Sequence, residues 1–531
     1  MEKLKLNIKN TILVGLAFAS IQVFWETYNY IVPQMLSRTY GLTDSLRGLI
    51  MGLDNILALF LLPLFGRLSD RTNTRFGKRT PYFILGTILS VALFIFLPVI
   101  ERSQLQEAKS IADEDNRIML WEYLGENEKN QLLKERADEF DPTGKSEAEI
   151  ANYLKQEFID IPMNVTENGK VKTSDEYKSF VLPALRGYLY KEVTQKNPAS
   201  LIIYIVVVFF LLVAMGTYRS PAVALMPDVT PEPLRSPANS IINLMGGIGT
   251  VLAMVVRTVL FATVSKNYYD GYSSIILATD ILMLVFFAIF MLTVRENKLL
   301  KERKRICEKF GIIEGIDDPA NKKKVRLRNL PWKQMKYFVL ALFAIALSTM
   351  ATDAINTNFS VYTTEDLHFG NDVASLVKTI AMVFSAVAFI PVGYMAYKLG
   401  RKKTIMIGFG CVAVSLLFGY FIRPASRYWF IASYFLMSFG SVIFTVNTLP
   451  LVLEKSDSNT VGTFTGFYYV ATMTAAAVSP YLCGLVTERF TRRSMFIYST
   501  TCMLLAMIIL YFVKGIGEKR KIHEVEAAKA E

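Results

Sequence analysis

Residues 45–79 read SLRGLIMGLDNILALFLLPLFGRLSDRTNTRFGKR. The part over 45–65 is apolar and matches the roughly 20 residues that a helix needs to cross the hydrocarbon core of a bilayer. The part over 71–79 is basic. Because short basic loops are typical of the cytoplasmic side of membrane proteins, this stretch predicts a membrane-spanning helix that leads into a cytoplasmic loop.

The same alternation continues along the 531-residue chain. Its composition agrees, with 52% hydrophobic residues, 36 Phe and a mean hydropathy of +0.33. Backbone polar groups in lipid must bond internally, so each apolar run is predicted to be a helix. The sequence therefore predicts an all-α membrane protein with twelve transmembrane helices. The predicted spans are 11–35, 45–65, 81–100, 199–218, 236–262, 274–294, 336–360, 373–397, 404–422, 428–452, 461–486 and 494–514.

The basic segments predict the orientation of the chain. Counting twelve spans places five of them on one side, which we expect to be the cytoplasm, while the basic run 487–494 falls on the other side. The net charge of +12 therefore reflects the basic loops of a membrane protein, and we do not take it as a sign of nucleic-acid binding. We expect a multi-pass protein of the cell membrane with both termini in the cytoplasm. The five segments are 1–10, 71–79, 295–337, 401–403 and 518–521.

Two interruptions divide the chain. The stretch 101–197 is acidic, with 14 Lys+Arg and 20 Asp+Glu, and is predicted to be an extracytoplasmic insert between helices 3 and 4. Its amphipathic patterns at 117–140 and 176–195 predict helices of a lid or a small docking domain. The predicted domains are an N-terminal six-helix bundle (1–100 and 198–294), the insert (101–197), a cytoplasmic central loop (295–335), a C-terminal six-helix bundle (336–515) and a cytoplasmic tail (516–531).

An internal repeat relates the two predicted bundles. At an offset of 327 residues, polar positions in the first and seventh spans coincide, with the same steps of 4, 3 and 4 residues. Such steps place each set on one helix face. The pattern predicts two pseudo-symmetric halves with a substrate cavity between them. The paired positions are Gln22, Glu26, Asn29 and Pro33 with Thr349, Asp353, Asn356 and Ser360.

Two motifs carry a family resemblance. The segment GRLSDR at 66–71, with GKR at 77–79, resembles the loop after the second helix of the major facilitator superfamily. The segment RSPAVALMPD at 219–228, followed by RSPAN at 235–239, is similar to the stretch between helices 4 and 5 of sucrose-type and glycoside–pentoside–hexuronide:cation symporters. The resemblance implies the major facilitator fold and uptake of a di- or oligosaccharide or glycoside. The co-transported ion would be H⁺, or less favourably Na⁺.

These motifs also nominate a conformational latch. A glycine permits close helix packing, and a carboxylate can cap a helix or pair with an arginine. The candidate latch residues are Gly66, Asp70, Arg71, Arg219 and Asp228.

Buried charges nominate the ion-coupling residues. A charged side chain at the centre of a membrane helix costs roughly 2.5–3.5 kcal/mol on insertion scales, so it is a functional candidate by default. Ion pairs between helices that serve only structure are the alternative. For the second helix, the resemblance implies that Asp54 contributes to a cation site. The candidate coupling residues are Glu26, Asp54 and Asp353.

Aromatic and polar neighbours of these acids suit a sugar. Aromatic faces match the apolar faces of a sugar ring, and amides or a guanidinium match its hydroxyl groups. The candidate substrate-binding residues are Gln22, Trp25, Tyr28, Asn29, Asn55, Arg257 and Asn356.

No pattern predicts an enzyme, because nucleophile–base constellations, metal spacings and nucleotide-binding loops do not occur. We expect no cofactor beyond the co-transported ion and no metal. The expected partners are the bilayer and a small sugar, with no nucleic acid, and we expect a monomer. A drug or metabolite:proton antiporter is an alternative function. A membrane sensor or scaffold that uses the insert 101–197 is another.

Overall fold

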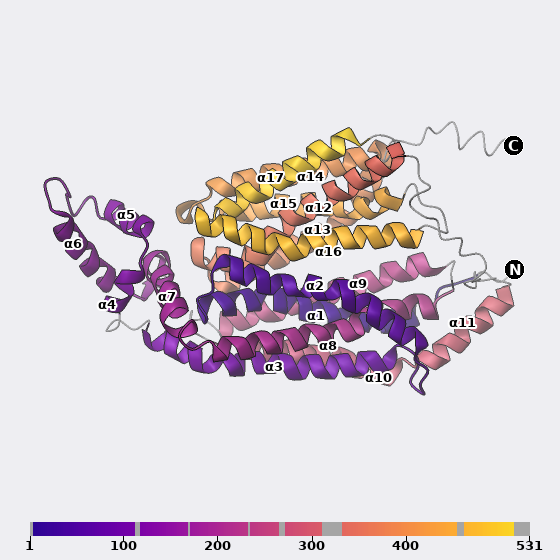
Figure 1. The fold of residues 1–531 in the computed structure, drawn as a ribbon. Helices are drawn as coiled ribbons and strands as arrows, with labels where there is room; N and C mark the ends of the chain where they lie inside the picture. Colours follow the sequence, from indigo (N-terminus) through magenta and orange to yellow (C-terminus); the bar gives the residue numbers. More distant parts are fainter. Residues whose placement is uncertain are drawn as a thin grey trace. The chain divides into compact units, whose positions relative to one another are not determined.

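The computed structural model describes residues 4–111, 117–167, 170–231, 234–264, 271–310, 332–453 and 461–513. Nearly all of the described chain is helical (Figure 1). Within it, eleven helices are long and apolar enough to cross a membrane. A further helix, α13 (Asn371–Leu399), lies where the remaining span is predicted. The prediction of helical spans is confirmed, whereas the count of twelve stays a prediction.

The chain divides into two compact units. The first comprises 1–51, 60–312 and 357–376, and the second comprises 52–59, 313–356 and 377–531. Helices α2, α12 and α13 therefore each contribute to both units. The division into two six-helix bundles with a separate insert stays a prediction.

The first unit is built on two helix pairs that pack closely. Helix α1 packs against α9 and α10, and α3 packs against α8 and α10. Aromatic rings fill the space between α3 and α10, where Phe83 lies 4.7 Å from Phe290 between ring centroids. The long helices are α1 (Ile8–Arg38), α2 (Asp44–Arg71), α3 (Thr80–Ile111), α8 (Ala199–Val229), α9 (Arg235–Thr263) and α10 (Ser273–Thr293).

The second unit is also helical. Helix α14 packs against α15 and α17, and α16 packs against both α15 and α17. A small buried cluster of Phe338, Ile345, Val452 and Phe464 joins α12, α15 and α16. The helices are α12 (Trp332–Val361), α13, α14 (Arg401–Phe421), α15 (Trp429–Leu453), α16 (Val461–Arg489) and α17 (Ser494–Phe512), and η8 (Pro424–Ser426) is a short turn between α14 and α15.

Several helices are longer than their apolar runs. Helix α2 continues through Arg71, α3 continues to Ile111, and α8 continues to Val229. The sequence GRLSDR is therefore the end of a helix and not a loop, which corrects the sequence prediction. A helix ends where backbone hydrogen bonding ends, and hydropathy marks only where its surroundings become polar.

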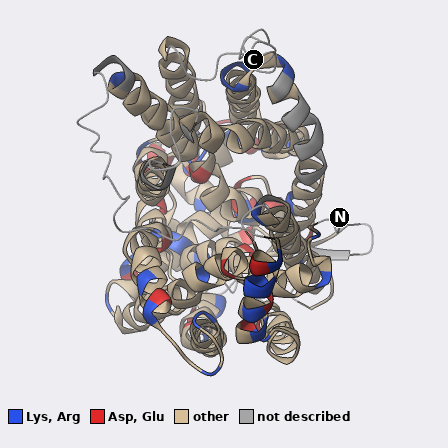
Figure 2. Ribbon diagram, turned by 90° about the vertical axis from the view of Figure 1, so that its right-hand side faces the viewer, with Lys and Arg blue, Asp and Glu red and all other residues tan. Residues whose placement is uncertain are grey.

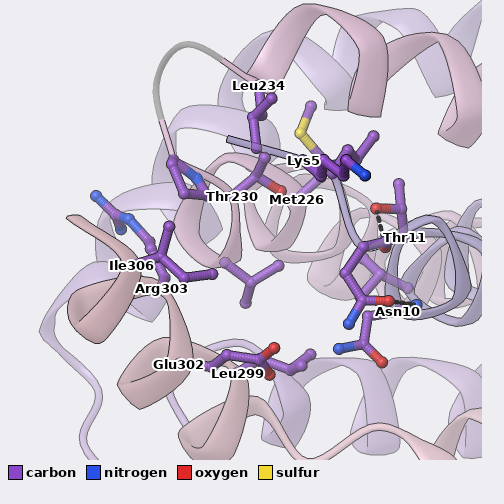
Figure 3. Close-up of a pocket in the computed structure, with 15 residues that line it drawn as sticks. Lys5, Asn10, Thr11, Met226, Thr230, Leu234, Leu299, Glu302, Arg303 and Ile306 are labelled. Atoms are coloured by element: carbon purple, nitrogen blue, oxygen red, sulfur yellow. Dashed lines mark hydrogen bonds between the residues drawn. The ribbon is translucent and has the colours of Figure 1, made fainter. Parts of the chain in front are cut away.

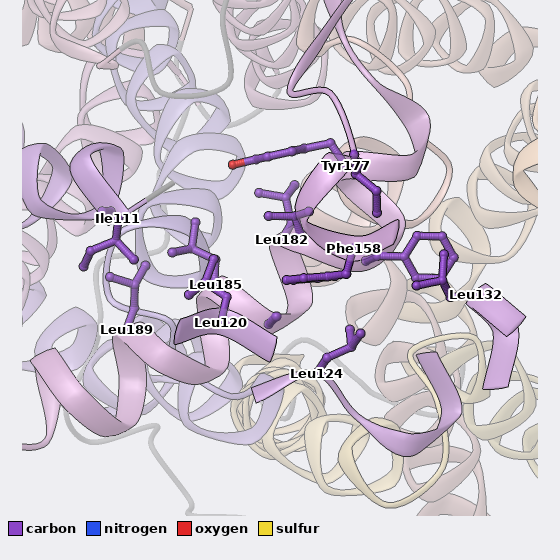
Figure 4. Close-up of a cluster of buried hydrophobic side chains, with 14 of the residues drawn as sticks. Ile111, Leu120, Leu124, Leu132, Phe158, Tyr177, Leu182, Leu185 and Leu189 are labelled. Carbon is purple, nitrogen blue, oxygen red and sulfur yellow. The ribbon is translucent and has the colours of Figure 1, made fainter. Parts of the chain in front are cut away.

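The insert has a core of its own. Its helices enclose a buried cluster that includes Leu120, Leu132, Phe158 and Leu185 (Figure 4). The predicted helix over 117–140 is wrong, because Gly125 is the N-cap that starts a new helix there. The predicted 176–195 helix is confirmed as a continuous helical segment with two π-turns. The elements are α4 (Arg117–Leu120), η2 (Trp121–Tyr123), α5 (Glu126–Glu135), α6 (Glu147–Asp160), η3 (Tyr177–Val181), α7 (Leu182–Tyr188) and η4 (Leu189–Thr194).

Sequence reasoning missed two parts of the insert. Helix α6 begins with a capping box, in which the Ser146 hydroxyl accepts from the Glu149 N–H and the Glu149 carboxylate accepts from the Ser146 N–H. An antiparallel hairpin follows, with β1 (Asn164–Glu167) paired to β2 (Lys170–Thr173). The Ser-x-x-Glu pattern at 146–149 was a readable signal for the start of this helix.

The basic central loop contains helix α11 (Glu296–Phe310). Within the first unit, α11 and the insert lie at opposite ends of the long helices (Figure 1). Figure 2 views the molecule from the α11 end, where Lys and Arg are coloured blue. The exposed cationic side chains of α11 are Lys298, Lys301, Lys304, Arg305 and Lys309.

Candidate functional site

A buried ion pair joins α1 to α9 in the first unit. Nη1 of Arg257 lies 3.0 Å from Oε1 of Glu26, and the Arg257 side chain is completely buried. The same Nη1 donates to the Glu26 carbonyl oxygen at 3.1 Å. Two residues predicted to act in coupling and substrate binding are thus brought together.

Further contacts hold the Arg257 guanidinium in place. Nε donates to the Ser375 hydroxyl at 3.0 Å, and the guanidinium carbon lies 4.0 Å from the centroid of the Tyr30 ring. Nη2 is buried and has no hydrogen-bond partner in the described part of the chain. One donor of a positioned cation therefore remains available to a polar ligand.

An aromatic group lies beside this pair on α1. The ring of Trp25 packs edge-on against Phe24 and Tyr28, with centroid separations of 5.2 and 5.7 Å. The Arg219 guanidinium lies 5.3 Å from the Trp25 ring. The Trp25 indole N–H is buried and has no acceptor among the described residues. Arg219, predicted as part of the latch, thus lies beside this aromatic group.

The polar face of α1 has the exposure pattern expected of the internal repeat. Gln22 and Glu26 are half-buried, Asn29 is exposed and Pro33 is buried. The corresponding positions of α12 follow the same order: Thr349 and Asp353 are half-buried, Asn356 is exposed and Ser360 is buried. The paired positions of α1 and α12 thus agree in the exposure of their side chains as well as in their spacing.

The remaining candidate acids lie in the second unit. Oδ1 of Asp54 accepts from the backbone N–H of Asn55 at 2.6 Å and from its side-chain amide at 2.7 Å. Asp353 of α12 belongs to the same unit as Asp54. The structure therefore places two predicted coupling residues in one unit. Carboxylate and amide oxygens are ligands that suit a hard cation.

Arg79, which was not among the predicted latch residues, contacts three of them: Gly66, Asp70 and Asp228. Its Nε lies 2.8 Å from Oδ2 of Asp228, and its Nη2 lies 2.5 Å from Oδ1 of Asp70. Nη1 donates to the Gly66 carbonyl oxygen at 3.3 Å. Burial alone would lower the pKa of Arg79, but the hydrogen bonds and charges of Asp228 and Asp70 outweigh it, so the pKa is raised. Arg71, the predicted member, is exposed.

Glu296 completes this network and was missed by sequence reasoning. Its buried carboxylate accepts from the backbone N–H groups of Lys78, Arg79 and Thr80 at 2.7–3.1 Å. It therefore caps the first turn of α3, where the helix dipole favours an anion. Gly77 has φ +119°, and a Cβ there would lie 2.3 Å from the Glu296 carboxylate, so only glycine fits. The Gly77-Lys78-Arg79 motif was visible, but its partner lies 217 residues away.

At the other end of the first unit, the insert contacts the turn after α12. This turn comprises η7 (Tyr362–Asp366) and continues to Gly370. Nη1 of Arg186 lies 2.6 Å from Oε2 of Glu365, and Ser37 donates to Oε1 of Glu365 at 3.1 Å. Nζ of Lys178 donates to the carbonyl oxygen of His368 at 3.2 Å. The insert is thus bonded to the segment that leads from α12 to α13.

A pocket lies near α11 (Figure 3). The start of α1, the end of α8 and the half-buried face of α11 enclose it. Arg303 donates to the Asp228 carbonyl oxygen at 2.7 Å and so ties α11 to the end of α8. None of the predicted site residues lines this pocket. Among the described residues, no group of three or more His, Cys, Asp or Glu could hold a metal ion.

Comparison with known proteins places the chain in a family. The profile described as "MFS/sugar transport protein" matches residues 13–102, and the profile described as "Major Facilitator Superfamily" matches residues 341–530. Together the two profiles cover more than half of the chain, which therefore belongs to the Major Facilitator Superfamily. An uncharacterized MFS-type transporter of Methanocaldococcus jannaschii is 26% identical over 211 residues, which cover 37% of this chain and 49% of that protein.

Shorter matches connect this superfamily member with named sugar transporters. Lactose permease of Lactobacillus helveticus is 41% identical over 60 residues, which cover 11% of this chain and 9% of that protein. Proton-associated sugar transporter A of Homo sapiens is 36% identical over 69 residues, which cover 12% of this chain and 9% of that protein. The chain therefore matches about half the length of the archaeal relative and about a tenth of the other two.

Solved structures agree on the fold. A D-xylose–proton symporter superposes with a TM-score of 0.55 at 13% identity, covering 97% of this chain and 98% of that one. A peptide transporter in complex with sulfate gives 0.58 at 12% identity, covering 95% and 93%. Because these identities are low, they support the superfamily fold and not a substrate.

Proposed function

We propose that this transporter takes up a di- or oligosaccharide or glycoside together with H⁺ by alternating access. The observation that carries the proposal is the buried Glu26–Arg257 pair on a polar and aromatic face of α1. The pair holds a guanidinium in a fixed position while leaving Nη2 without a protein acceptor. A sugar hydroxyl is a matching acceptor, and the Trp25 indole N–H offers a second donor nearby.

The relatives support a sugar over other solutes. The profile that matches α1 and α2 is described as a sugar transport family, and two relatives are named as lactose and proton-associated sugar transporters. An aromatic ring beside paired hydrogen-bonding groups suits a ligand with one apolar face and a hydroxylated rim. We favour H⁺ over Na⁺ because the second of these relatives is named as a proton-associated transporter.

The proposed topology has twelve spans, with α13 as the eighth. Both termini and α11 lie in the cytoplasm, and the insert lies outside the cell membrane. The exposed basic face of α11 supports this orientation, because cytoplasmic segments are enriched in Lys and Arg. In this arrangement the Arg79 network is a cytoplasmic latch, and the Arg186–Glu365 contact is an external one.

Asp54 and Asp353 are the proposed second site for the coupled cation. Both are carboxyl groups of membrane helices in the second unit, so a bound proton or metal cation would offset the cost of burying their charges. A sodium-coupled transporter would use this pair, so it provides the structural basis for the less favoured ion.

Uptake into proteoliposomes tests the proposal. Purified protein is reconstituted, and labelled lactose, sucrose and melibiose are supplied under an imposed proton gradient or an imposed sodium gradient. We expect one or more of these sugars to accumulate under the proton gradient and to leak out when a protonophore is added. Uptake that is indifferent to both gradients for every sugar would contradict the coupling.

A further inference from the structure

Asp280 is a buried carboxyl group that the site described above does not use. It lies on α10, one-third of the way along the helix from Ser273, and its side chain is 2% exposed. Neither carboxylate oxygen has a hydrogen-bond partner in the described part of the chain. Such a group is unusual, because burying a polar atom without a partner costs free energy.

Neighbouring contacts fix the position of Asp280 in the unit. The hydroxyl group of Thr279 lies 2.9 Å from that of Thr27, so α10 meets α1 directly beside Glu26. On the other side, Phe83 of α3 lies against Phe287 and Phe290, two and three turns further along α10. Asp280 is thus a buried residue of α10 that directly follows the point at which this helix contacts Thr27 of α1.

The charged and titratable groups of the surrounding helices are engaged elsewhere. Helices α1, α3 and α9 pack against α10. Glu26 and Arg257 pair with each other, and Arg38 lies 3.6 Å from Glu101. Neither carboxylate oxygen of Asp280 accepts a hydrogen bond from any of these described groups. The charged and titratable side chains on these helices include Glu26, Tyr28, Tyr30, Arg38, Glu101 and Arg257.

An isolated carboxylate in this interface would be strongly destabilised, whereas a neutral carboxylic acid is tolerated. The geometry points to Asp280 as the residue that holds the coupled proton, separate from the Glu26–Arg257 pair that contacts substrate. This inference rests on the proposed proton-coupled uptake. It assigns different roles to the two acids because their surroundings differ.

The division of roles follows from charge compensation. Protonating Glu26 would leave Arg257 as a buried cation without its counterion, which is strongly unfavourable. Protonating Asp280 removes an uncompensated charge instead. Release of this proton would require α10 to open to water.

The test compares Asp280→Asn with Thr279→Val in proteoliposomes. The Asn variant mimics the neutral acid in shape but cannot exchange a proton, and the Val variant removes the adjacent contact while retaining the acid. We expect Asp280→Asn to exchange labelled sugar at equilibrium as the wild type does but to lose accumulation driven by a proton gradient. Thr279→Val should still accumulate sugar. Proton-driven accumulation by Asp280→Asn would overturn the assignment.

Infrared spectroscopy on the wild type keeps the inference testable if Asp280→Asn does not fold. A protonated aspartic acid gives a carboxylic C=O band that shifts when aspartate is labelled with ¹³C. We expect such a band at neutral pH and its loss in Asp280→Asn when that variant folds. Absence of any label-sensitive band would overturn the inference. A wild type that shows the band but no proton-driven uptake would instead locate the failure in the proposed function.

Discussion

Arg257 on α9 donates to both the carboxylate and the backbone carbonyl of Glu26 on α1. Arg257 is completely buried and the Glu26 side chain is 11% exposed, so the charge of Arg257 depends on Glu26 for compensation. Removing one partner of such a pair costs roughly 3–5 kcal/mol, because the other is left as an unpaired buried charge.

This dependence predicts the behaviour of single and double variants. Arg257→Met should lower thermal stability and abolish sugar uptake, whereas Arg257→Met combined with Glu26→Gln should recover much of the stability but no uptake. Thermal unfolding in detergent and uptake in vesicles measure the two effects. If the double variant is no more stable than Arg257→Met, the charges do not compensate each other as the structure indicates.

A second prediction concerns the Arg79 network. Arg79→Gln leaves Asp70 and Asp228 without their shared cation, and should slow uptake by releasing the contact between α2, α3 and α8. The exposed Arg71→Gln is the matched control, because it removes the same charge from the same segment. The measurement is the initial uptake rate of each variant. Equal rates for Arg79→Gln and Arg71→Gln would show that uptake depends on the basic charge of this segment and not on the Arg79 network.

A third prediction concerns the helix cap made by Glu296. Glu296→Gln removes the negative charge from the start of α3, and Glu296→Ala also removes the acceptor. We expect a loss of about 1–2 kcal/mol for the alanine variant and a smaller loss for glutamine, in line with other N-terminal caps. Glu308→Gln, on the exposed face of α11, is the control. Chemical unfolding provides the measurement, and equal effects of Glu296→Ala and Glu308→Gln would contradict the capping role.

A fourth prediction addresses the insert. Arg186→Glu should separate the insert from the turn 362–370, and the added exchange Glu365→Arg should restore the contact with reversed charges. We expect a changed uptake rate in the single variant and recovery in the double variant. A swap between Lys196 and Glu192, an ion pair within the insert, serves as the control. Failure of the double variant to recover would indicate that Arg186 acts through other partners.

A fifth prediction is a pH dependence within the insert. Hydrogen bonds from Lys196 and then Tyr123 lower the pKa of Glu192 below its ordinary value of 4.5. A lowered pKa means that the contact stabilises the fold above pH 4.5 and is lost as the pH falls. The wild type should therefore unfold at a higher temperature than Glu192→Gln at pH 7, and this difference should shrink below pH 4.5. A difference that stays constant with pH would contradict the ionic contribution.

Local sequence patterns predicted much of the fold. Apolar runs located the long helices, because a lipid-facing helix has to be apolar along its length. The insert was harder, since its short elements are set by local caps such as Ser146 and by Gly125 rather than by a long hydrophobic pattern. Helix ends were missed for the same reason, as hydropathy does not report backbone hydrogen bonding.

The sequence identified candidate site residues by their chemical type, but it did not indicate which of them contact each other. Glu26 and Arg257 were both candidates, yet their contact spans 231 residues of sequence. Arg79 was visible only as part of a basic cluster, and its role depends on Asp228, 149 residues away. The chemical type of a residue can be read from the sequence. The partner that compensates its charge is set by how the helices pack. The isolation of Asp280 therefore became evident only in the structure.

We propose that this protein carries sugar and a proton across the membrane together. Proteoliposomes that contain a trapped pH-sensitive dye, with no imposed gradient, allow a direct measurement when a transported sugar is added outside. We expect sugar entry to acidify the lumen in the wild type, and we expect Asp280→Asn to admit sugar without acidification. Sugar entry into wild-type vesicles with no change in luminal pH would show that sugar and proton do not move together.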